Sequence, residues 1–443
     1  MILGPIRLID LVVFALFLAP QFAFRVGVFR TVLVALRALP FILIRLPLQL
    51  IRQRYFTSTA AQPKFIQEST LFEDLLVRTI RYAFASIPPR VGQVFFSKWV
   101  WWPFLRWRML RHGYLKSPVR WQEYAHGKRR DGFQGIWITH KPDKTPDVVL
   151  YYIHGERRTR HRHRNAMLTK LGGGFSLGSA HFYLEFLMSW HTLLLQAGYQ
   201  NPAVFSLEYT LVPEGVYPKQ VDEVLQGYNH VLDVAKDPSK VFVGGDSAGG
   251  ALTLSLLQGL GAQGSHQKLK SVRPDPRGSL ADQRPLGLPL PRMAILISPW
   301  VTLRSSLHSA SRVDYLNRET AWKYAHEYAG ETMINRYPAS PGSCTDDNIW
   351  QQSSPEGGIY VIYGEEEVFA PDIESFLKRQ ERLGLQVRAE RIEGGIHAWP
   401  VASLLASSTN ERRLYGLRCI VNEMKRRTAG QVGVQRRRAK KSD

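Results

Sequence analysis

The stretch Lys240-Val-Phe-Val-Gly-Gly-Asp-Ser247-Ala-Gly-Gly250 decides the fold of this 443-residue chain. Residues 241–243 form a short apolar run of the strand type, and residues 251–257 favour a helix. Between them, Gly-Asp-Ser-Ala-Gly matches Gly-x-Ser-x-Gly, the nucleophile elbow that presents a serine on a tight strand-to-helix turn. Its glycines leave room where the strand and the helix approach closely. The pattern predicts Ser247 as a nucleophile; the alternative is a chance match in a glycine-rich loop.

Four further segments accompany the elbow along the chain. They are His154-Gly155 with Gly173-Gly174-Phe175, Glu208-Tyr-Thr-Leu-Val-Pro-Glu214, Ser298-Pro-Trp300 and Gly394-Gly-Ile-His397-Ala-Trp399. With the elbow they resemble, in the same order, the motifs of the hormone-sensitive-lipase-like (fold-3) α/β-hydrolases, which are serine esterases, over roughly residues 140–427. The chain is similar in particular to the membrane-anchored fungal branch that includes steryl acetyl hydrolases. The resemblance implies the α/β-hydrolase fold, with a mostly parallel central sheet, flanking helices and a helical cap.

Alternating apolar runs predict the same architecture. Strand candidates are separated by helical stretches, as in a parallel sheet flanked by helices; they are residues 147–153, 203–208, 240–244, 293–298, 359–363 and 386–392. We assign residues 136–427 to the catalytic domain and residues 56–135 to a helical, aromatic-rich linker that contributes to the cap. Residues 261–291 are expected to form a flexible loop, and residues 428–443 a basic, disordered tail.

A serine becomes an effective nucleophile when a base takes its proton. His397 is the predicted base, because it lies in a glycine-rich loop after the last strand candidate and because the order serine, acid, histidine suits this fold. The acid must orient the imidazole and stabilise its charge. Glu367 is the predicted acid, at a position where the family that the chain resembles usually has Asp. Glu366 is the alternative, and Asp372 is a third candidate.

The resemblance also implies an oxyanion hole. Backbone N–H groups of Gly173, Gly174 and Ala248 would bind the oxyanion, and His154, Gly155 and Gly172 would support the loop that carries the first two. The helix N-terminus after Ser247 adds positive potential at the same place.

The two halves of this loop are separated by residues 156–171, which contain six Lys or Arg and one Glu. The codons for residues 156–172 can be written with a splice donor, a fungal-type branch sequence and an acceptor, and their removal restores His154-Gly155-Gly173-Gly174-Phe175. We therefore interpret residues 156–172 as a translated intron. A bulging surface loop and an arm that binds nucleic acid or an acidic substrate are the alternatives. Because losing one oxyanion donor lowers the rate by roughly 10²–10³, the chain as written is expected to catalyse poorly.

Residues 1–55 are predicted to be a membrane anchor. Residues 8–24 are apolar apart from Asp10 and Gln21, and their length is close to the minimum for a spanning helix. No cleavage site of the signal-peptide type follows clearly, which favours an anchor that is retained.

Residues 26–51 continue the apolar segment with a different pattern. Arg30, Arg37 and Arg45, together with Arg52, fall within an arc of about 80° on a helix. Such a pattern is typical of an amphipathic helix lying on a lipid surface. A helix that packs into the protein core is the alternative.

The charge balance also favours membrane lipid as a partner. The chain has 58 Lys and Arg against 37 Asp and Glu, a formal net charge of +21, and anionic lipid attracts basic segments near an anchor. Four tryptophans between Trp99 and Trp107 lie among Lys and Arg, a composition that suits a membrane interface or an apolar cap. The zinc-finger and phosphate-loop spacings are lacking, so a nucleic-acid partner is not expected.

Together these features predict a membrane-associated serine hydrolase that cleaves carboxylic esters of lipophilic alcohols, sterol acetates among them, through an acyl-enzyme. No cofactor or metal is expected, and no oligomeric state is predicted. The resemblance implies the endoplasmic reticulum membrane and its lumen, whereas the positive-inside rule places the catalytic domain in the cytosol. Two alternatives stay open: an amide or formamide hydrolase, and a catalytically impaired membrane-bound interaction protein if residues 156–171 are present in the cell.

Overall fold

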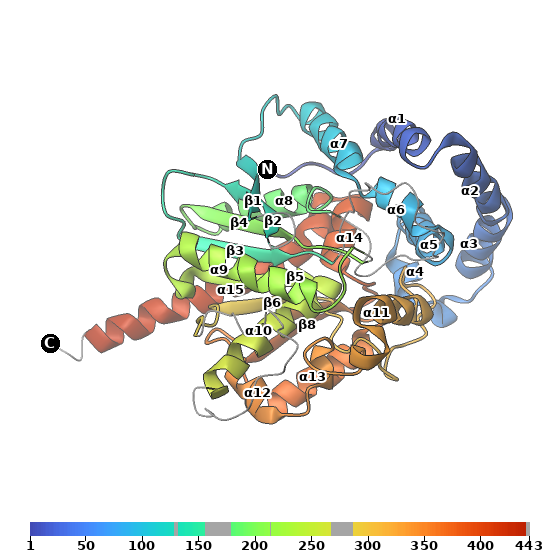
Figure 1. Cartoon of the computed structure of the whole chain (residues 1–443). Coiled ribbons are helices and arrows are strands. Elements are labelled where there is room, and N and C mark those ends of the chain that lie inside the picture. The colour runs from blue at the N-terminus through green and yellow to red at the C-terminus, as the bar shows by residue number, and fades with distance from the viewer. Residues whose placement is uncertain (128–131, 156–178, 213, 267–286, 440–443) are drawn as a thin grey trace.

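The computed structural model describes residues 1–127, 132–155, 179–212, 214–266 and 287–439. In this part of the chain, an eight-stranded sheet has the order β1-β2-β4-β3-β5-β6-β7-β8 (Figure 1). Strands β3 to β8 pair in parallel, whereas β1 with β2 and β2 with β4 pair antiparallel. The strands are β1 (Arg120–His126), β2 (Phe133–Thr139), β3 (Val148–Ile153), β4 (Pro202–Glu208), β5 (Val241–Asp246), β6 (Met293–Ile297), β7 (Ile359–Gly364) and β8 (Val387–Ile392).

The central strands are apolar because the sheet is covered on both faces. In β3, Tyr151 and Ile153 belong to one hydrophobic core, and Leu150 and Tyr152 belong to the other. Side chains alternate between the faces of a strand, so a run without polar residues fills both cores. This confirms the prediction of a mostly parallel sheet flanked by helices, and the six predicted strand candidates correspond to β3 to β8.

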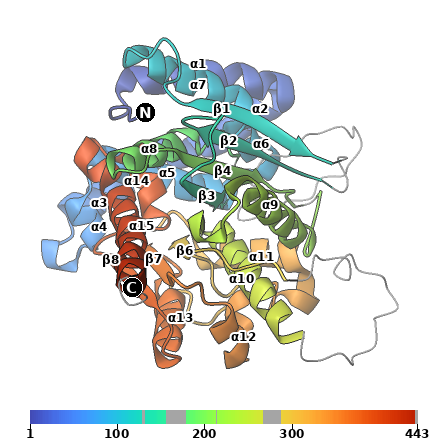
Figure 2. The ribbon, with the colours of Figure 1, turned by 90° about the vertical axis from the view of Figure 1, so that its left-hand side faces the viewer.

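Helices form a layer on each face of the sheet, as Figure 2 shows. On one side lie α8 (Leu184–Gln196), α14 (Trp399–Ala406) and α15 (Asn410–Ala439). The opposite side carries α9 (Lys219–Ala235), α10 (Ala248–His266), α11 (Arg318–Met333), α12 (Asp347–Gln352) and α13 (Ala370–Arg382).

The N-terminal region is helical and lies to one side of the sheet. Its helices are α1 (Leu8–Arg25), α2 (Val28–Pro40), α3 (Leu46–Tyr55), α4 (Lys64–Glu68), α5 (Leu71–Ser86), α6 (Pro89–Phe95) and α7 (Lys98–Arg111), with a π-helical turn at Phe41–Arg45. Figure 1 shows α1, α2 and α3 as an arc outside α5 and α6. By length and composition alone, Leu8–Arg25 and Val28–Tyr55 are each long and apolar enough to cross a membrane.

The structure corrects the prediction for residues 120–135. They form β1 and the start of β2, with residues 128–131 outside the described part, and not a helical linker. β1 is an edge strand with mainly exposed polar side chains, so its sequence carries little apolar alternation. It forms because it pairs with β2 along its whole length, from Arg120 to His126.

The C-terminal prediction is corrected as well. Residues 428–439 belong to α15 and are helical, where disorder was predicted; residues 440–443 lie outside the described residues. The first half of α15 is nucleated by buried Leu414, Leu417 and Ile420, and a nucleated helix adds further residues at little cost.

Residues 261–266, the start of the predicted flexible loop 261–291, are likewise helical, because α10 continues to His266. Residues 267–286 lie outside the described residues. The predicted insert, residues 156–172, and the loop glycines Gly173 and Gly174 lie outside them too.

Candidate active site

Ser247 lies on the sharp turn between β5 and α10, at the carboxyl edge of the parallel strands. Its φ is 52°, in the left-handed region that non-glycine residues rarely adopt. The turn is held by two backbone hydrogen bonds of 3.0 Å, from Ser247 N–H to Ile297 and from Trp300 N–H to Ser247. A Cβ on Gly249 would lie 1.9 Å from the Ile153 carbonyl oxygen, so only glycine allows this approach. The strand, turn and helix are those that the motif predicts.

His397 lies in the loop between β8 and α14 and faces the serine. Its Nε2 is 2.8 Å from Ser247 Oγ, a hydrogen-bond distance. The imidazole is buried, and burial alone lowers the pKa of His397. The carboxylates of Glu367, Asp314 and Asp246 outweigh burial and raise that pKa above its ordinary value. The site therefore favours the imidazolium that forms when the serine proton is transferred.

Glu367 follows β7 and lies behind the histidine. Its Oε1 is 3.7 Å from His397 Nδ1, longer than a direct hydrogen bond. Catalytic contacts are often long in the absence of substrate and tighten when it binds. The other oxygen accepts hydrogen bonds from Ser298 Oγ (2.5 Å) and from Gly364 N–H (3.0 Å). Ser247, His397 and Glu367 are thus brought together in the arrangement of a catalytic triad.

The carboxylates of the two alternative acids, Glu366 and Asp372, accept hydrogen bonds from backbone N–H groups away from His397. Glu366 accepts the backbone N–H groups of Lys64 (2.8 Å) and Phe65 (3.2 Å) at the start of α4. Asp372, on α13, accepts the N–H of Thr302 at 3.0 Å. Of the three carboxylates proposed from the sequence, Glu367 is the one that the structure places beside the imidazole.

Asp314 is a site residue that the sequence analysis missed. It is fully buried in the segment between β6 and α11. One of its oxygens accepts the N–H of His397 at 3.1 Å, and the other accepts the N–H of Val368, next to Glu367, at 2.9 Å. One side chain thus joins the histidine loop to the acid loop. Burial and the negative charge of Glu367 raise the pKa of Asp314 to about 6, although His397 opposes this.

Ser298 gives the Ser-Pro-Trp motif a structural purpose. Its φ is 45°, and its hydroxyl donates to Glu367 Oε2 while accepting the N–H of Ala398 at 2.9 Å. The hydroxyl therefore joins the carboxylate to the residue that follows the histidine. The motif was visible in the sequence, but this role depends on contacts across 69 and 100 residues of chain.

The described half of the oxyanion loop is fixed to the elbow through Asp246. This buried carboxylate accepts hydrogen bonds from the hydroxyls of Tyr152 (2.6 Å) and Tyr183 (2.7 Å) and from the N–H of Gly155 (3.0 Å). The ring of His154 stacks against Tyr183, with ring centroids 5.5 Å apart. Ala248 begins α10, so its N–H belongs to the free N-terminal turn of that helix. Gly172, Gly173 and Gly174 lie outside the described residues.

An apolar cavity leads from Ser247 and His397 toward the N-terminal helices. Its other polar lining side chains are Tyr183, Asp246 and Tyr315, and the rest of its wall is apolar. The N-terminal region contributes Ile6, Leu11, Phe14, Phe72, Leu76, Val77, Ile80, Phe84, Phe95, Phe96, Trp101 and Phe104. Trp101 of the tryptophan cluster lines this cavity, whereas Trp99 is half exposed. An apolar group of a bound molecule would therefore be placed next to the nucleophile.

Comparisons with known proteins agree with this geometry. A family model described as alpha/beta hydrolase fold matches residues 170–401, and one described as steryl acetyl hydrolase matches residues 31–275. The chain is 23% identical over 337 residues to a putative steryl acetyl hydrolase of Schizosaccharomyces pombe, across 73% of this chain and 78% of the relative. It is 26% identical over 267 residues to an acetyl-hydrolase of Streptomyces hygroscopicus, across 59% of this chain and 71% of the relative.

Solved structures share the fold. An esterase of the bacterial hormone-sensitive lipase family has a TM-score of 0.55 at 21% identity, over 81% of this chain and 99% of that one. A fungal esterase of Rhizomucor miehei has a TM-score of 0.58 at 15% identity, over 82% and 98% of the two chains. These matches confirm the family resemblance that the five motifs predicted.

Proposed function

The chain belongs to the steryl acetyl hydrolase family of α/β-hydrolase-fold proteins and is a carboxylic ester hydrolase; on this premise we propose that it is a membrane-associated serine esterase acting on esters of lipophilic alcohols. The observation that carries the proposal is the 2.8 Å contact between His397 Nε2 and Ser247 Oγ at the end of an apolar cavity. Sterol acetates are the substrates that we favour, because they present a large apolar alcohol beside a small acyl group.

In the proposed acylation step, Ser247 Oγ attacks the ester carbonyl carbon while His397 Nε2 takes the hydroxyl proton. The imidazolium then donates this proton to the leaving oxygen as the C–O bond breaks, so the alcohol leaves neutral and the acyl group stays on Oγ. Water, deprotonated by the same nitrogen, attacks the acyl carbon and releases the carboxylic acid and free Ser247. The scheme uses no cofactor.

Glu367 is proposed to set the tautomer of His397. A proton kept on Nδ1 by the carboxylate leaves Nε2 free to accept the serine proton. The carboxylate also stabilises the imidazolium in the buried site, where water screens charge poorly. The 3.7 Å separation requires the two loops to close slightly when substrate binds.

The negative charge that develops on the carbonyl oxygen is proposed to be bound by the N–H groups of Ala248, Gly173 and Gly174, with His154, Gly155 and Gly172 in support. The intron hypothesis for residues 156–172 belongs to this part of the proposal. It is supported by the sequence itself, because removal of these residues joins His154-Gly155 to Gly173-Gly174-Phe175.

Membrane association is supported by the surface of the N-terminal helices. Leu8, Leu16, Phe24, Phe29 and Leu43 are all more than half exposed to solvent, and an apolar surface of this extent is expected to be covered. Leu11 and Phe14 of α1 line the cavity from the other side, so a lipid-soluble ester has a short path to Ser247.

The test is the rate of hydrolysis of a short nitrophenyl ester and of a sterol acetate in detergent micelles. The full chain and a variant lacking residues 156–172 are compared, with Ser247→Ala in each as the blank. We expect Ser247-dependent hydrolysis of both esters, faster by roughly 10²–10³ in the shortened chain because the oxyanion donors are restored.

Three outcomes would separately test the intron hypothesis, the sterol substrate and the serine mechanism. Equal rates in the two chains would refute the intron hypothesis and leave the esterase in place. Activity on the nitrophenyl ester alone would refute the sterol substrate. Rates no higher than the Ser247→Ala blank in both folded chains would refute the serine mechanism and favour the interaction protein.

A further inference from the structure

Asp10 holds the N-terminal end of α1 against the catalytic body. This residue lies inside the apolar segment, yet its side chain is fully buried in protein. Its carboxylate is 2.8 Å from Arg111 Nε and 3.4 Å from Arg108 Nη1, and it accepts a hydrogen bond of 3.0 Å from Trp107 Nε1. All three partners belong to α7. A charge that the sequence places in a candidate membrane span is therefore paired inside the protein.

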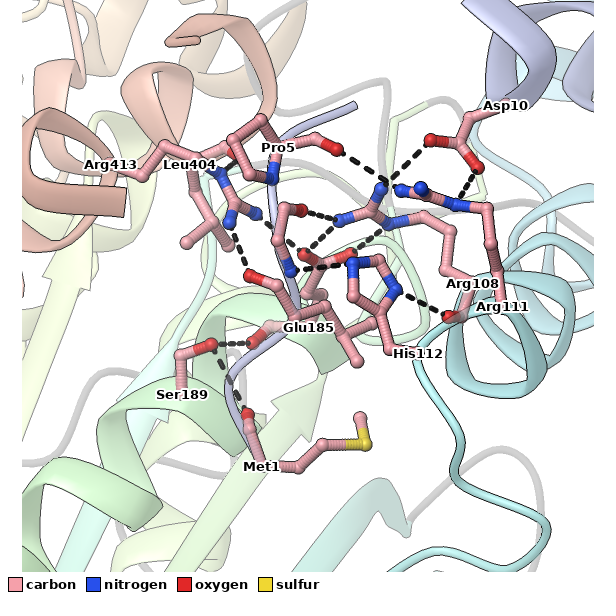
Figure 3. Close-up of polar contacts among 12 residues, drawn as sticks. Met1, Pro5, Asp10, Arg108, Arg111, His112, Glu185, Ser189, Leu404 and Arg413 are labelled. Carbon is pink, nitrogen blue, oxygen red and sulfur yellow. Dashed lines mark hydrogen bonds and ion pairs between the residues drawn. The ribbon is translucent and has the colours of Figure 1, made fainter. Parts of the chain in front are cut away.

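Arg108 connects α1 to the core of the hydrolase (Figure 3). The carboxylate of Glu185 on α8 accepts two hydrogen bonds of 2.8 Å from Arg108. It accepts a third, also of 2.8 Å, from Arg413 of α15. These side chains also bind the backbone before α1: Arg108 donates to the Gly4 carbonyl at 2.6 Å, and Arg413 donates to that of Leu3. Residues 3–10 are thus bound by α7 and α15, whose arginines meet at Glu185 of α8.

The other end of the segment is held by a second, partly buried ion pair. Arg54, at the end of α3, lies 2.8 Å from the buried carboxylate of Asp74 on α5 and donates to the Ser69 carbonyl at 2.7 Å. Phe41 stacks on Tyr82 of α5, with ring centroids 4.1 Å apart. Both ends of residues 8–55 are therefore fixed to the same body.

The face of the segment that points away from this body is apolar and basic. Leu16, Phe29 and Leu43 are 65%, 81% and 67% exposed, and the exposed arginines at 25, 30, 37, 45 and 52 lie among them. Apolar side chains that reach the acyl boundary, with guanidinium groups at the level of the phosphates, match the chemistry of one phospholipid leaflet.

We propose that residues 8–55 bind one leaflet in its plane, with both ends on the side of the catalytic domain, and that they do not cross the bilayer. The proposal rests on the membrane association proposed above. A helix of 18 residues is about 27 Å long, so α1 used as a span would carry one end to the far side of the bilayer. Phe14, further along α1 than Asp10, would then leave Phe95, Trp101 and Phe104, against which its ring packs.

In this arrangement one face of α1 lines the cavity and the opposite face contacts lipid. Phe14 packs against Phe95, Trp101 and Phe104 with ring centroids 5.0 to 5.3 Å apart, and it lines the cavity that reaches Ser247. Leu16, on the other face, would lie in lipid. A lipophilic ester would then pass from the leaflet to the nucleophile along α1.

The first test is the sidedness of single cysteines in sealed microsomes that contain the full chain. Arg7→Cys and Ser58→Cys flank the segment, Arg25→Cys lies at the turn between α1 and α2, and Glu411→Cys marks the catalytic domain; all four positions are exposed. Cys344 and Cys419 are replaced by serine in every variant. A membrane-impermeant maleimide is expected to label all four cysteines together, either before or only after permeabilisation. Labelling of Arg7→Cys or Arg25→Cys from the side opposite to Glu411→Cys would overturn the proposal.

The second test is co-sedimentation with vesicles of phosphatidylcholine and phosphatidylserine. Leu16→Glu and Phe29→Glu are each expected to weaken vesicle binding roughly tenfold, because a charge replaces an apolar side chain in the acyl boundary. Val216→Glu, at a half-exposed apolar residue outside the segment, is the matched control and is expected to bind like the parent chain. Equal binding of all three variants would overturn the in-plane surface. A parent chain that stays in the supernatant would refute membrane association itself, while its esterase rate would still be measured in micelles.

Discussion

Asp314→Asn tests whether the buried carboxylate between the two loops positions His397. The two carboxylate oxygens accept the N–H groups of His397 and Val368 at 3.1 and 2.9 Å. An amide has one oxygen to accept with and presents an NH₂ group to the second donor. One of the two buried N–H groups would therefore lose its acceptor, at a cost of about 1–3 kcal/mol. We expect kcat/KM to fall by roughly 10-fold to 100-fold as the loop shifts to relieve this.

The same change has a pH signature that a purely structural defect lacks. The charges that raise the pKa of His397 come from Glu367, Asp314 and Asp246. Removing the charge of Asp314 lowers that pKa. Because His397, the proposed base, can accept a proton only when neutral, activity should be lost as the pH falls through this pKa, and the acid limb of kcat/KM should move to lower pH.

The assay is the pH profile of nitrophenyl ester hydrolysis, with circular dichroism as the check that the variant is folded. Asp143→Asn, an exposed carboxylate before β3, is the matched control and should leave the profile in place. A folded Asp314→Asn enzyme whose acid limb coincides with that of the parent chain would refute the reasoning.

Three further predictions follow from the site. Glu367→Gln should lower kcat by about 10³–10⁴ because the amide no longer selects the tautomer with the proton on Nδ1, whereas Glu367→Asp, measured beside it, should retain more activity. Phe14→Ala should lower kcat/KM for a sterol acetate by roughly tenfold or more and change that for nitrophenyl acetate much less, because Phe14 belongs to the apolar wall that the N-terminal helices contribute to the cavity; equal losses would contradict this. In the parent chain the acid limb should lie above pH 6.5, the ordinary pKa of histidine, and a limb below that value would show that burial outweighs the three carboxylates.

Local patterns in the sequence were enough to single out Ser247 and His397, which the structure places 2.8 Å apart, and six of the strands. The elbow around Ser247 depends on the order strand, glycine-rich turn, helix, which neighbouring residues encode by themselves. β3 to β7 were predicted for the same reason, because a strand covered on both faces is a continuous apolar run, whereas β8 is an edge strand with charged side chains. β1 was missed because its register comes from pairing with β2 and not from its own composition.

Other features were decided by tertiary contacts. Glu365, Glu366 and Glu367 are adjacent in sequence, and the choice among them follows from which carboxylate the loop turns toward His397. Glu366 is taken up by backbone N–H groups about 300 residues away. Asp314 belongs to no recognisable motif. Its role comes from hydrogen bonds to Val368 and His397, which lie 54 and 83 residues further along the chain.

The N-terminal segment shows the same division. Its apolar composition and spaced arginines were visible in the sequence, and they predicted contact with lipid. Asp10 looked like one polar interruption of that segment, and its partners Arg108 and Arg111 lie about 100 residues further along the chain. Periodicity and composition report on how a residue suits its immediate neighbours. Which charges meet, and on which side of a membrane a helix end stays, depends on the path of the whole chain, which tertiary packing alone determines.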